Sequence, residues 1–263
     1  MNYTTILFKI IAGVAILTLN RPNRLNSFNA LMHQEVRDAL KQMQVNNSVR
    51  VLLLTGAGRG FCTGQDLSDS NIAIKTAIPD PGISIEKGYN PLVRTLRGLE
   101  IPVVCAVNGV AAGAGVNVAL ACDIVLAARS ATFIQSFCKI GLVPDTGGTW
   151  FLPRLVGSAR ATALTMLGDE VSAEQAEQWG MIWKCVDDAV LLDEADRLAR
   201  HLATQPTKSL ALIKRALHAA TVNSLDEQLD LERDYQRLAS RTEDYREGVA
   251  ALLEKREPVF KGR

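Results

Sequence analysis

The sequence predicts an α/β fold with a largely parallel sheet, followed by a helical region. Over roughly the first 190 residues, short apolar strand-like runs alternate with stretches of helical potential, which is typical of parallel sheets covered by helices. Beyond about Ser172 the strand-like runs nearly stop, and the patterns become helical and rich in Leu, Ala, Arg and Glu. The length of 263 residues, 48% of them hydrophobic, suits one large domain with a small appendage.

The first half of the chain is predicted to hold most of the strands. Two runs at 6–10 and 14–19 flank Ala12-Gly13 and indicate a hairpin. Apolar residues at helical spacing predict a helix from Asn29 to Gln44. Further strands are expected at Val49–Thr55, Pro102–Val107, Asp123–Ala128 and Thr132–Gln135. The segment from Ser68 to Tyr89 contains several Pro and Gly residues without a sustained period, so we expect a long irregular loop there.

The second half is predicted to be mainly helical. Ser172 and Gln175 fit a capping box, which indicates a helix ending near Trp179. A last short strand is expected at 182–186. Four helical patterns follow, at Val190–Thr204, Thr207–Ala220, Leu225–Ser240 and Glu243–Lys255. We expect residues 1–200 to form the core and residues 201–263 to form a helical oligomerisation region, with no internal sequence repeat.

Composition excludes several classes of function. The chain has 29 basic and 28 acidic residues, so it lacks the general basic field of a nucleic-acid-binding protein. Its apolar runs are too short to span a bilayer, and its first residues do not resemble a signal peptide. We therefore expect a cytoplasmic protein with neither nucleic acid nor membrane as a partner. The five cysteines lack metal-ligand spacing and the three histidines fall in predicted surface helices, so no metal site is expected.

Two glycine-rich segments follow predicted strands. The segment from Gly56 to Asp66 fails the dinucleotide-binding pattern because Phe61 stands where a glycine is needed, and it lacks a P-loop lysine. It is either a simple turn or a backbone that presents N–H groups near Gly64 and Gln65 to a ligand. The segment from Asn108 to Asn117 is either a close helix–sheet contact or a helix N-terminus that binds an anion.

Asp145 is the third feature. It follows Pro144 and precedes a predicted helix, so helix capping is the simpler explanation from sequence alone. The alternative is a carboxylate that points into a pocket as a base.

Taken together, these segments resemble the crotonase superfamily, the enoyl-CoA hydratase/isomerase family. The resemblance is carried by the stretches Leu19–Asn29, Leu54–Leu67, Ala106–Gly115, Gly141–Trp150 and Ser172–Met181. It implies a spiral of β-β-α repeats with C-terminal helices used for trimerisation, giving a homotrimer or a dimer of trimers. It also implies an acyl-CoA substrate, whose coenzyme A is part of the substrate rather than a separate cofactor.

The resemblance assigns roles to individual residues. The backbone N–H groups of Gln65 and Ala114 would form an oxyanion hole for the thioester carbonyl. Hydratases of the family use two glutamates, and this chain has Asn117 and Phe137 in their places, so simple hydration is not expected. Asp145 would instead act as a single acid/base, which suits isomerisation. Contacts with substrate or coenzyme A are expected from Arg24, Gly64, Asp66, Leu67, Asn117, Phe260 and Lys261.

Within the superfamily, the chain most resembles isomerases that convert ring-epoxidised phenylacetyl-CoA to a seven-membered oxepin-CoA. The matching stretches are Arg24–Asn29, Gly56–Cys62, Asn90–Arg94, Trp179–Trp183 and Leu229–Ala239. Alternatives are an isomerase that shifts β,γ double bonds of enoyl-CoAs and a non-catalytic acyl-CoA-binding protein. Aryl-CoA dehalogenation is disfavoured because no histidine lies between His33 and His201, and RNA binding because the helix Leu31–Gln44 carries mixed charges.

Overall fold

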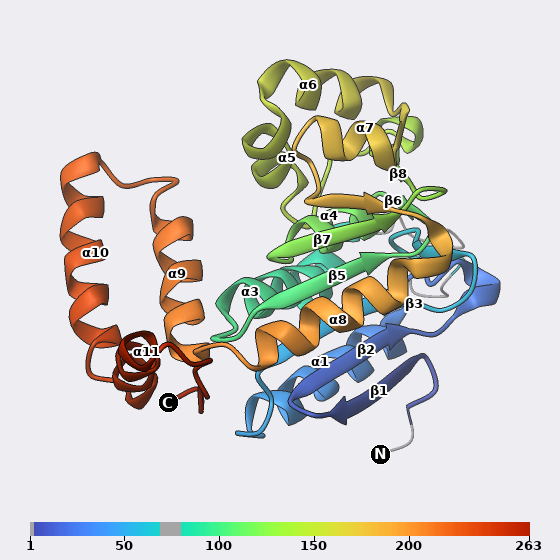
Figure 1. Ribbon diagram of the computed structural model, residues 1–263. Helices are drawn as coiled ribbons and strands as arrows, with labels where there is room; N and C mark the ends of the chain where they lie inside the picture. The colour runs from blue at the N-terminus through green and yellow to red at the C-terminus, as the bar shows by residue number, and fades with distance from the viewer. Residues whose placement is uncertain (1–2, 69–79) are drawn as a thin grey trace.

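The structure is a computed structural model that describes residues 3–68 and 80–263, and two sheets organise the described chain (Figure 1). The larger sheet consists, in spatial order, of β1 (Ile6–Ile11), β2 (Val14–Leu19), β3 (Val51–Gly56), β5 (Val103–Val107), β7 (Ile124–Ala128) and β10 (Lys184–Val186). The smaller sheet consists of β4 (Gly60–Cys62), β6 (Val110–Ala112), β8 (Thr132–Ile134) and β9 (Glu170–Ser172). Among the strand pairs of the described residues, β1–β2 and β8–β9 are antiparallel and the others are parallel, so the predicted α/β class is confirmed.

The strands follow a repeating path between the two sheets. β3, β5 and β7 are parallel neighbours in the larger sheet, and the strand after each of them, β4, β6 and β8, pairs in parallel in the smaller one. This is the β-β-α spiral that the family resemblance implied. The sequence contains no matching repeat, because the repeated feature is the hydrogen-bond topology. The connections and core side chains differ from one turn to the next.

Helices cover the sheets and complete the spiral. Those before residue 180 are α1 (Ala30–Gln44), α2 (Pro81–Ser84), α3 (Asn90–Gly98), α4 (Ala114–Leu120), α5 (Gly148–Val156), α6 (Ser158–Leu167) and α7 (Ala173–Gln178). Asn29 caps α1 by accepting a hydrogen bond from the Met32 backbone N–H at 2.9 Å. The capping box predicted at Ser172 is present, with the Gln175 N–H donating to its hydroxyl at 3.2 Å.

The expectation of an irregular loop from Ser68 to Tyr89 is partly wrong. Residues 69–79 lie outside the described residues, but 81–89 form α2 and a π-helical turn, Ile85–Tyr89, that leads into α3. Asp80 accepts a hydrogen bond from the Gly82 N–H at 2.8 Å, and Pro81 occupies the first helical position. Proline is favoured there because its missing N–H has no intrahelical partner, so this proline begins a helix rather than breaking one.

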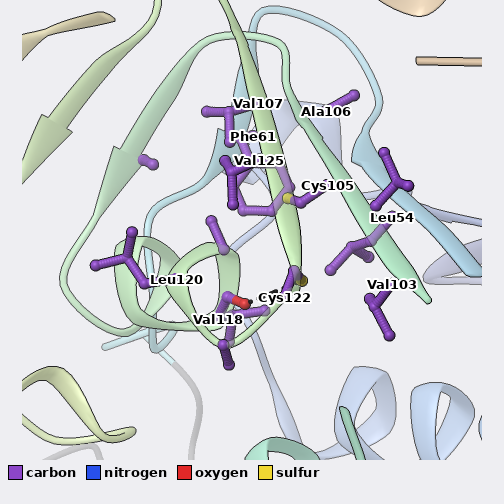
Figure 2. Close-up of a cluster of buried hydrophobic side chains, with 14 of the residues drawn as sticks. Leu54, Phe61, Val103, Cys105, Ala106, Val107, Val118, Leu120, Cys122 and Val125 are labelled. Atoms are coloured by element: carbon purple, nitrogen blue, oxygen red, sulfur yellow. Dashed lines mark hydrogen bonds between the residues drawn. The ribbon is translucent and has the colours of Figure 1, made fainter. Parts of the chain in front are cut away.

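The centre of the core is made by β5 and α4 (Figure 2). All seven residues of α4 are buried, and small residues allow the helix to approach the neighbouring strand closely. A Cβ at Gly115 would lie only 2.1 Å from the carbonyl oxygen of Cys62. Cys105 and Cys122 are free thiols in the same cluster, and burial raises the pKa of the Cys62 thiol to about 12. These three thiols act as small apolar side chains in the core.

The C-terminal helices leave the core after α8 (Leu191–Ala203). α8 lies across the larger sheet, in contact with β3, β5 and β7, and the expected boundary near residue 200 falls in its last turn. Three helices then extend away from the sheets (Figure 1): α9 (Thr207–Ala219), α10 (Leu225–Ala239) and α11 (Glu243–Glu254). The helical tail, residues 204–263, is thus a separate arm of the molecule, as Figure 1 shows.

Two basic side chains that are buried or half-buried help to join the helical tail to the core. Arg50 donates to the carbonyl oxygens of Gln205 at 2.5 Å and Phe260 at 3.0 Å. Lys214 of α9 is buried, where its ammonium donates to the Leu96 carbonyl at 2.9 Å and lies 2.8 Å from the Asp123 carboxylate. These contacts join both ends of the tail to the spiral.

Candidate functional site

Two backbone segments meet where β4 and β6 end. The strands are parallel neighbours, so the residues after them emerge at the same edge of the smaller sheet. Gly64 and Gln65 follow β4, while Gly113 and Ala114 follow β6. A Cβ at Gly64 would lie 3.1 Å from both the Ala112 carbonyl oxygen and the Ala114 nitrogen. The two segments are therefore in direct contact, as the sequence spacing alone could not establish.

The backbone N–H groups of Gln65 and Ala114 point away from the hydrogen bonds that join neighbouring segments. Gln65 pairs with Phe28 in an isolated parallel bridge, whose two hydrogen bonds, Phe28 N–H to the Gly64 carbonyl and Asp66 N–H to the Phe28 carbonyl, both use Phe28. Ala114 is the first residue of α4, where a helix N–H has no intrahelical acceptor. Gly64 and Gly113, the residues before these two, have φ values of +81° and +53°, which favour glycine.

The Gln65 segment is held in place by the neighbouring Asp66. This carboxylate forms an ion pair with Arg21 at 2.8 Å and accepts hydrogen bonds from the Ser68 N–H at 3.0 Å and the Ser68 hydroxyl at 2.6 Å. Burial opposes its ionisation, but the hydrogen bonds from Ser68 and Arg21 hold the pKa of Asp66 below its ordinary value. Both oxygens of Asp66 are thus engaged within the protein, which gives this residue a positioning role.

Asn117 connects α4 to the loop that carries Asp145. The Asn117 amide N–H donates to the Asp145 carbonyl oxygen at 2.8 Å, and the amide oxygen accepts from Gln135 Nε2 at 2.8 Å. Asn117 is fully buried and lies one helical turn after Ala114. A Cβ at Gly148 would lie 2.4 Å from the Asn117 amide nitrogen, so the loop packs directly on α4. Asn117 thereby holds the backbone of Asp145 against α4, the helix that begins at Ala114.

Asp145 is a half-buried carboxylate before α5. Burial raises its pKa, and a 2.7 Å hydrogen bond from the Thr146 hydroxyl offsets part of the rise. Helix capping, the simpler sequence-based explanation, is wrong because α5 begins at Gly148 with Gly147 at the N-cap position. The intervening Thr146 has a φ of +54°, which is rare for a β-branched residue and is found mainly where a functional site demands it.

Comparison with known proteins agrees with this arrangement. The sequence model of the enoyl-CoA hydratase/isomerase family matches residues 9–263. The chain belongs to the enoyl-CoA hydratase/isomerase family. It is similar to the 1,2-epoxyphenylacetyl-CoA isomerase of Escherichia coli strain K12, with 61% identity over 258 residues that cover 98% of each chain.

Further relatives lie within the same family. The 2,3-dehydroadipyl-CoA hydratase of Escherichia coli strain K12 is 34% identical over 250 residues, which cover 95% of this chain and 96% of that protein. A crystal structure of an enoyl-CoA hydratase from Polaromonas sp. JS666 superposes with a TM-score of 0.92 at 34% identity. The match covers 97% of this chain and 99% of that one, so the crotonase-like fold extends through the helical tail.

Asn117 and Phe137, which the family resemblance matches to the two glutamates of hydratases, are not acids. Asn117 is used internally, as described above. Phe137 is buried, and a Cβ at Gly113 would lie 3.7 Å from its ring, so it forms an apolar wall beside the start of α4. The loop of Asp145 is bound to α4 through Asn117, so Asp145 is the candidate acid/base beside the edge of the smaller sheet where the Gln65 and Ala114 segments meet. We call this edge the oxyanion edge, after the role expected for the two N–H groups.

The remaining predicted contacts fall in two places. Arg24 ends a short 3₁₀ turn, Pro22–Arg24, and is exposed, as is Leu67 beside the Gln65 segment. Phe260 and Lys261 lie elsewhere: Arg50, which binds the Phe260 carbonyl, precedes β3 and so stands at the opposite end of that strand from Gly56. The fold does not bring the C-terminus to the oxyanion edge of its own chain.

Two side chains near the site were missed by the sequence patterns. The expectation that His33 lies on a surface helix is wrong, because its ring packs 4.8 Å from Phe28 and 4.5 Å from Tyr89 between centroids. Burial and the nearby Arg37 lower the pKa of His33 to about 4. Tyr89 belongs to the stretch expected to be a loop. Periodicity could not find either residue, since their partners come from distant parts of the chain.

Within the described ranges 3–68 and 80–263, no cluster of three or more His, Cys, Asp or Glu side chains has a geometry that could hold a metal ion. In the same ranges, no helix combines the length and apolarity needed to cross a bilayer.

Proposed function

We propose that this chain is an acyl-CoA isomerase that converts ring-1,2-epoxyphenylacetyl-CoA to oxepin-CoA in aerobic phenylacetate degradation. The observation that carries the proposal is the half-buried carboxylate of Asp145, whose backbone is held against α4 by Asn117, while Asn117 and Phe137 supply no second acid. The 61% identity to the 1,2-epoxyphenylacetyl-CoA isomerase of Escherichia coli supports the choice of substrate.

The proposed role of each group follows from where negative charge develops during the reaction. Asp145 removes a proton from the carbon next to the thioester, and the electron pair moves onto the carbonyl oxygen to form an enolate. The N–H groups of Gln65 and Ala114 donate to that oxygen, and one such preorganised donor is worth about 3–4 kcal/mol. The raised pKa of Asp145 makes it a stronger base than an exposed aspartate.

The proton then returns to a more distant carbon, which requires no second base and no activated water. The ring expansion breaks the carbon–carbon bond of the three-membered ring, and the electron pair of that bond joins the π system of the seven-membered ring. The ring carbon that bears the acyl chain thereby becomes unsaturated, so the enolate is conjugated with the ring and the proton held by Asp145 returns to a ring carbon. Coenzyme A enters as part of the substrate, with its phosphates near the exposed Arg24 and its pantetheine passing Gly64 and Leu67. We propose no separate cofactor and no metal, and a cytoplasmic location in keeping with the free thiols.

We also propose that the protein assembles as a homotrimer or a dimer of trimers through the helical tail. α10 buries none of its residues in the single chain, while Leu252 and Leu253 of α11 are each 78% exposed. Apolar surface of this extent is typical of protein interfaces. Sedimentation at micromolar concentration should give a trimer or hexamer, and a monomer would contradict this assignment. The C-terminal Phe260 and Lys261 would then contact a neighbouring subunit's coenzyme A.

A substrate panel tests the proposed function. The enzyme should turn over ring-epoxidised phenylacetyl-CoA faster than 3-enoyl-CoA, and it should hydrate crotonyl-CoA very poorly because both hydratase glutamates are missing. Preference for 3-enoyl-CoA would favour the alternative of a general double-bond isomerase. A hydration rate within about tenfold of the isomerisation rate would overturn the single-carboxylate mechanism, since general acid–base catalysis by a missing group is worth about 10²–10⁴-fold. If the wild-type protein turns over no acyl-CoA in the panel, the alternative of a non-catalytic acyl-CoA-binding protein would be favoured.

A further inference from the structure

Three buried polar atoms beside the site have no hydrogen-bond partner. They are Oε1 of Gln65, Nε2 of His33 and the hydroxyl oxygen of Tyr89. Tyr89 is 1% exposed, so its hydroxyl cannot be satisfied by bulk solvent. Buried polar atoms in native proteins are almost always paired, because an unpaired one has lost its water without compensation. The acid–base mechanism described above uses none of the three.

The three side chains converge from distant parts of the sequence around Phe28. The His33 and Tyr89 rings meet edge to face with centroids 4.5 Å apart, and the Phe28 ring lies 5.6 Å from Tyr89. Gln65 is paired with Phe28 through the backbone, and its side chain comes near enough to His33 to offset part of the fall in the imidazole pKa. No hydrogen bond of normal geometry satisfies either Oε1 or Nε2.

The local backbone is built to hold this cluster. Tyr89 ends a π-helical turn, and such turns are rare and frequently occur at functional sites. The glycine at position 88 is required, because a Cβ there would lie 2.8 Å from two atoms of the His33 ring. The turn therefore allows the imidazole to lie flat against the backbone while Tyr89 reaches the interior.

The cluster adjoins the catalytic groups. Gln65 carries one of the two proposed oxyanion donors on its own backbone. Burial raises the pKa of Tyr89 well above its ordinary value, and interaction with Cys62 and Asp145 raises it further. An acyl group whose carbonyl is bound by the N–H groups of Gln65 and Ala114 would therefore begin beside the residue whose side chain belongs to this cluster.

We propose that Tyr89, His33 and Gln65 form a polar subsite that binds one oxygen atom carried on the ring of the acyl group, an inference that rests on the proposed function. The Tyr89 hydroxyl and a neutral imidazole offer two donors, which suit an acceptor such as an epoxide or ether oxygen. Gln65 Oε1 adds an acceptor that a ring hydroxyl can use. The subsite would make the enzyme select oxygen-bearing aryl-acetyl thioesters over plain ones.

Selection of this kind follows from the cost of unpaired groups. An acyl group without the oxygen leaves the three atoms unpaired. An epoxide or ether oxygen accepts from Tyr89 and His33, and a ring hydroxyl also donates to Gln65 Oε1. Sites built to bind a polar atom discriminate strongly against analogues that lack it. The subsite thus acts on substrate preference, and the proton transfer by Asp145 is a separate step.

Binding measurements with two unreactive ligands test the subsite. Dissociation constants for (2-hydroxyphenyl)acetyl-CoA and phenylacetyl-CoA are compared in the wild type and in Tyr89→Phe, which removes only the hydroxyl and keeps the ring packing. We expect the preference for the hydroxylated ligand to fall about fivefold to tenfold, as for the loss of one hydrogen bond. Tyr3→Phe is the matched control, because it also removes a buried unpartnered hydroxyl but lies at the N-terminal hairpin, against Phe8.

The outcomes separate the subsite from the proposed function. An equal preference in the wild type, Tyr89→Phe and Tyr3→Phe would overturn the subsite even if the epoxide is turned over. A fall confined to Tyr89→Phe would support it even if the wild type fails to convert the epoxide, and that failure would count against the proposed function alone. Melting temperature supplies a folding check, and Tyr89→Phe should melt no lower than the wild type because it removes an unpaired buried hydroxyl.

Discussion

The oxyanion edge of the spiral and the helical tail are positioned by different forces. At the edge, α4 is buried along its whole length and two glycines with positive φ direct the donors. In the tail, α10 buries none of its residues, and the contacts with the core include the charged groups of Arg50, Lys214 and Arg215. The edge is therefore fixed by close packing within one chain. The tail is held by a few charged contacts, and part of its apolar surface remains exposed.

This difference indicates how each region should respond to substitution. The main-chain donors at the edge do not depend on the side chains of Gln65 and Ala114. We therefore expect kcat to depend there only on groups that take part in the chemistry or hold the backbone in place. In the tail, a single buried ion pair should dominate the free energy of unfolding, while exposed pairs contribute little. The following predictions test both statements.

The largest expected effect is that of Asp145→Asn on turnover. We expect kcat to fall about 10²–10⁴-fold, because the variant loses the basic carboxylate. Acyl-CoA binding should be nearly unchanged, since affinity comes from the coenzyme A contacts and the two backbone donors. Steady-state kinetics and calorimetric binding measure the two quantities. A folded variant that retains more than about half of the wild-type kcat would exclude Asp145 as the general base.

Next comes the buried ion pair of the tail. Lys214 and Asp123 are 7% and 17% exposed, so Lys214→Met would leave a buried carboxylate without its partner. The free energy of unfolding should fall by about 3–5 kcal/mol. Arg215→Met, one residue along, removes an exposed pair with Glu100 and should cost about 0–1 kcal/mol. If urea denaturation gives equal losses of unfolding free energy for the two variants, burial of the ion pair does not determine how strongly it stabilises the contact between tail and core.

Asn117→Leu tests whether the edge depends on a positioning side chain. Leucine cannot donate to the Asp145 carbonyl, so the carboxylate should move and kcat should fall about 10- to 100-fold. The dissociation constant for an acyl-CoA should stay within about twofold, because the backbone donors remain. The pH profile of kcat/KM should also change, since its acid limb reports the pKa of Asp145. A loss of affinity with an unchanged profile would instead indicate direct substrate contact by Asn117.

The smallest effect concerns pH and stability. The pKa of Asp145 is higher in the folded than in the unfolded chain, so the folded state binds more protons between the two values. Stability contributed by this group is therefore lost as pH rises from the ordinary pKa through the raised one. The Asp145→Asn variant should not show this loss. Its melting temperature should be slightly higher than that of the wild type at neutral pH, and the difference should vanish in acid. A lower melting temperature at neutral pH would show that the carboxylate stabilises the fold.

Some of the site could be predicted from sequence because it depends on local chemistry. Buried strands such as β3 and β5, and the cap at Ser172, follow from hydrophobic patterning and side-chain-to-backbone bonds between near neighbours. The family motifs named Gln65, Ala114 and Asp145. The strands β4 and β6 were missed because they lie within the two glycine-rich segments, and β9 because it ends at the helix-capping residue Ser172.

Other features arise only when distant segments pack. The Asn117–Asp145 hydrogen bond joins residues 28 positions apart, and the His33–Tyr89 contact crosses from α1 to a stretch whose prolines and glycines predicted a loop. The capping explanation for Asp145 failed because the helix start is set by the left-handed Thr146 and Gly147. No local propensity favours that conformation for threonine, so the surrounding contacts must impose it.

By itself, the sequence determined the fold class, the family and the absence of acids at residues 117 and 137, because these depend on residue identity and on periodicity within single elements. The tertiary structure decided that the Gly64 and Ala114 segments touch, that Asp145 is half-buried with a raised pKa, and that three polar atoms around Phe28 lack partners. The physical reason is that desolvation and hydrogen-bond pairing depend on which segments exclude water from each other, and that is settled only when the spiral closes.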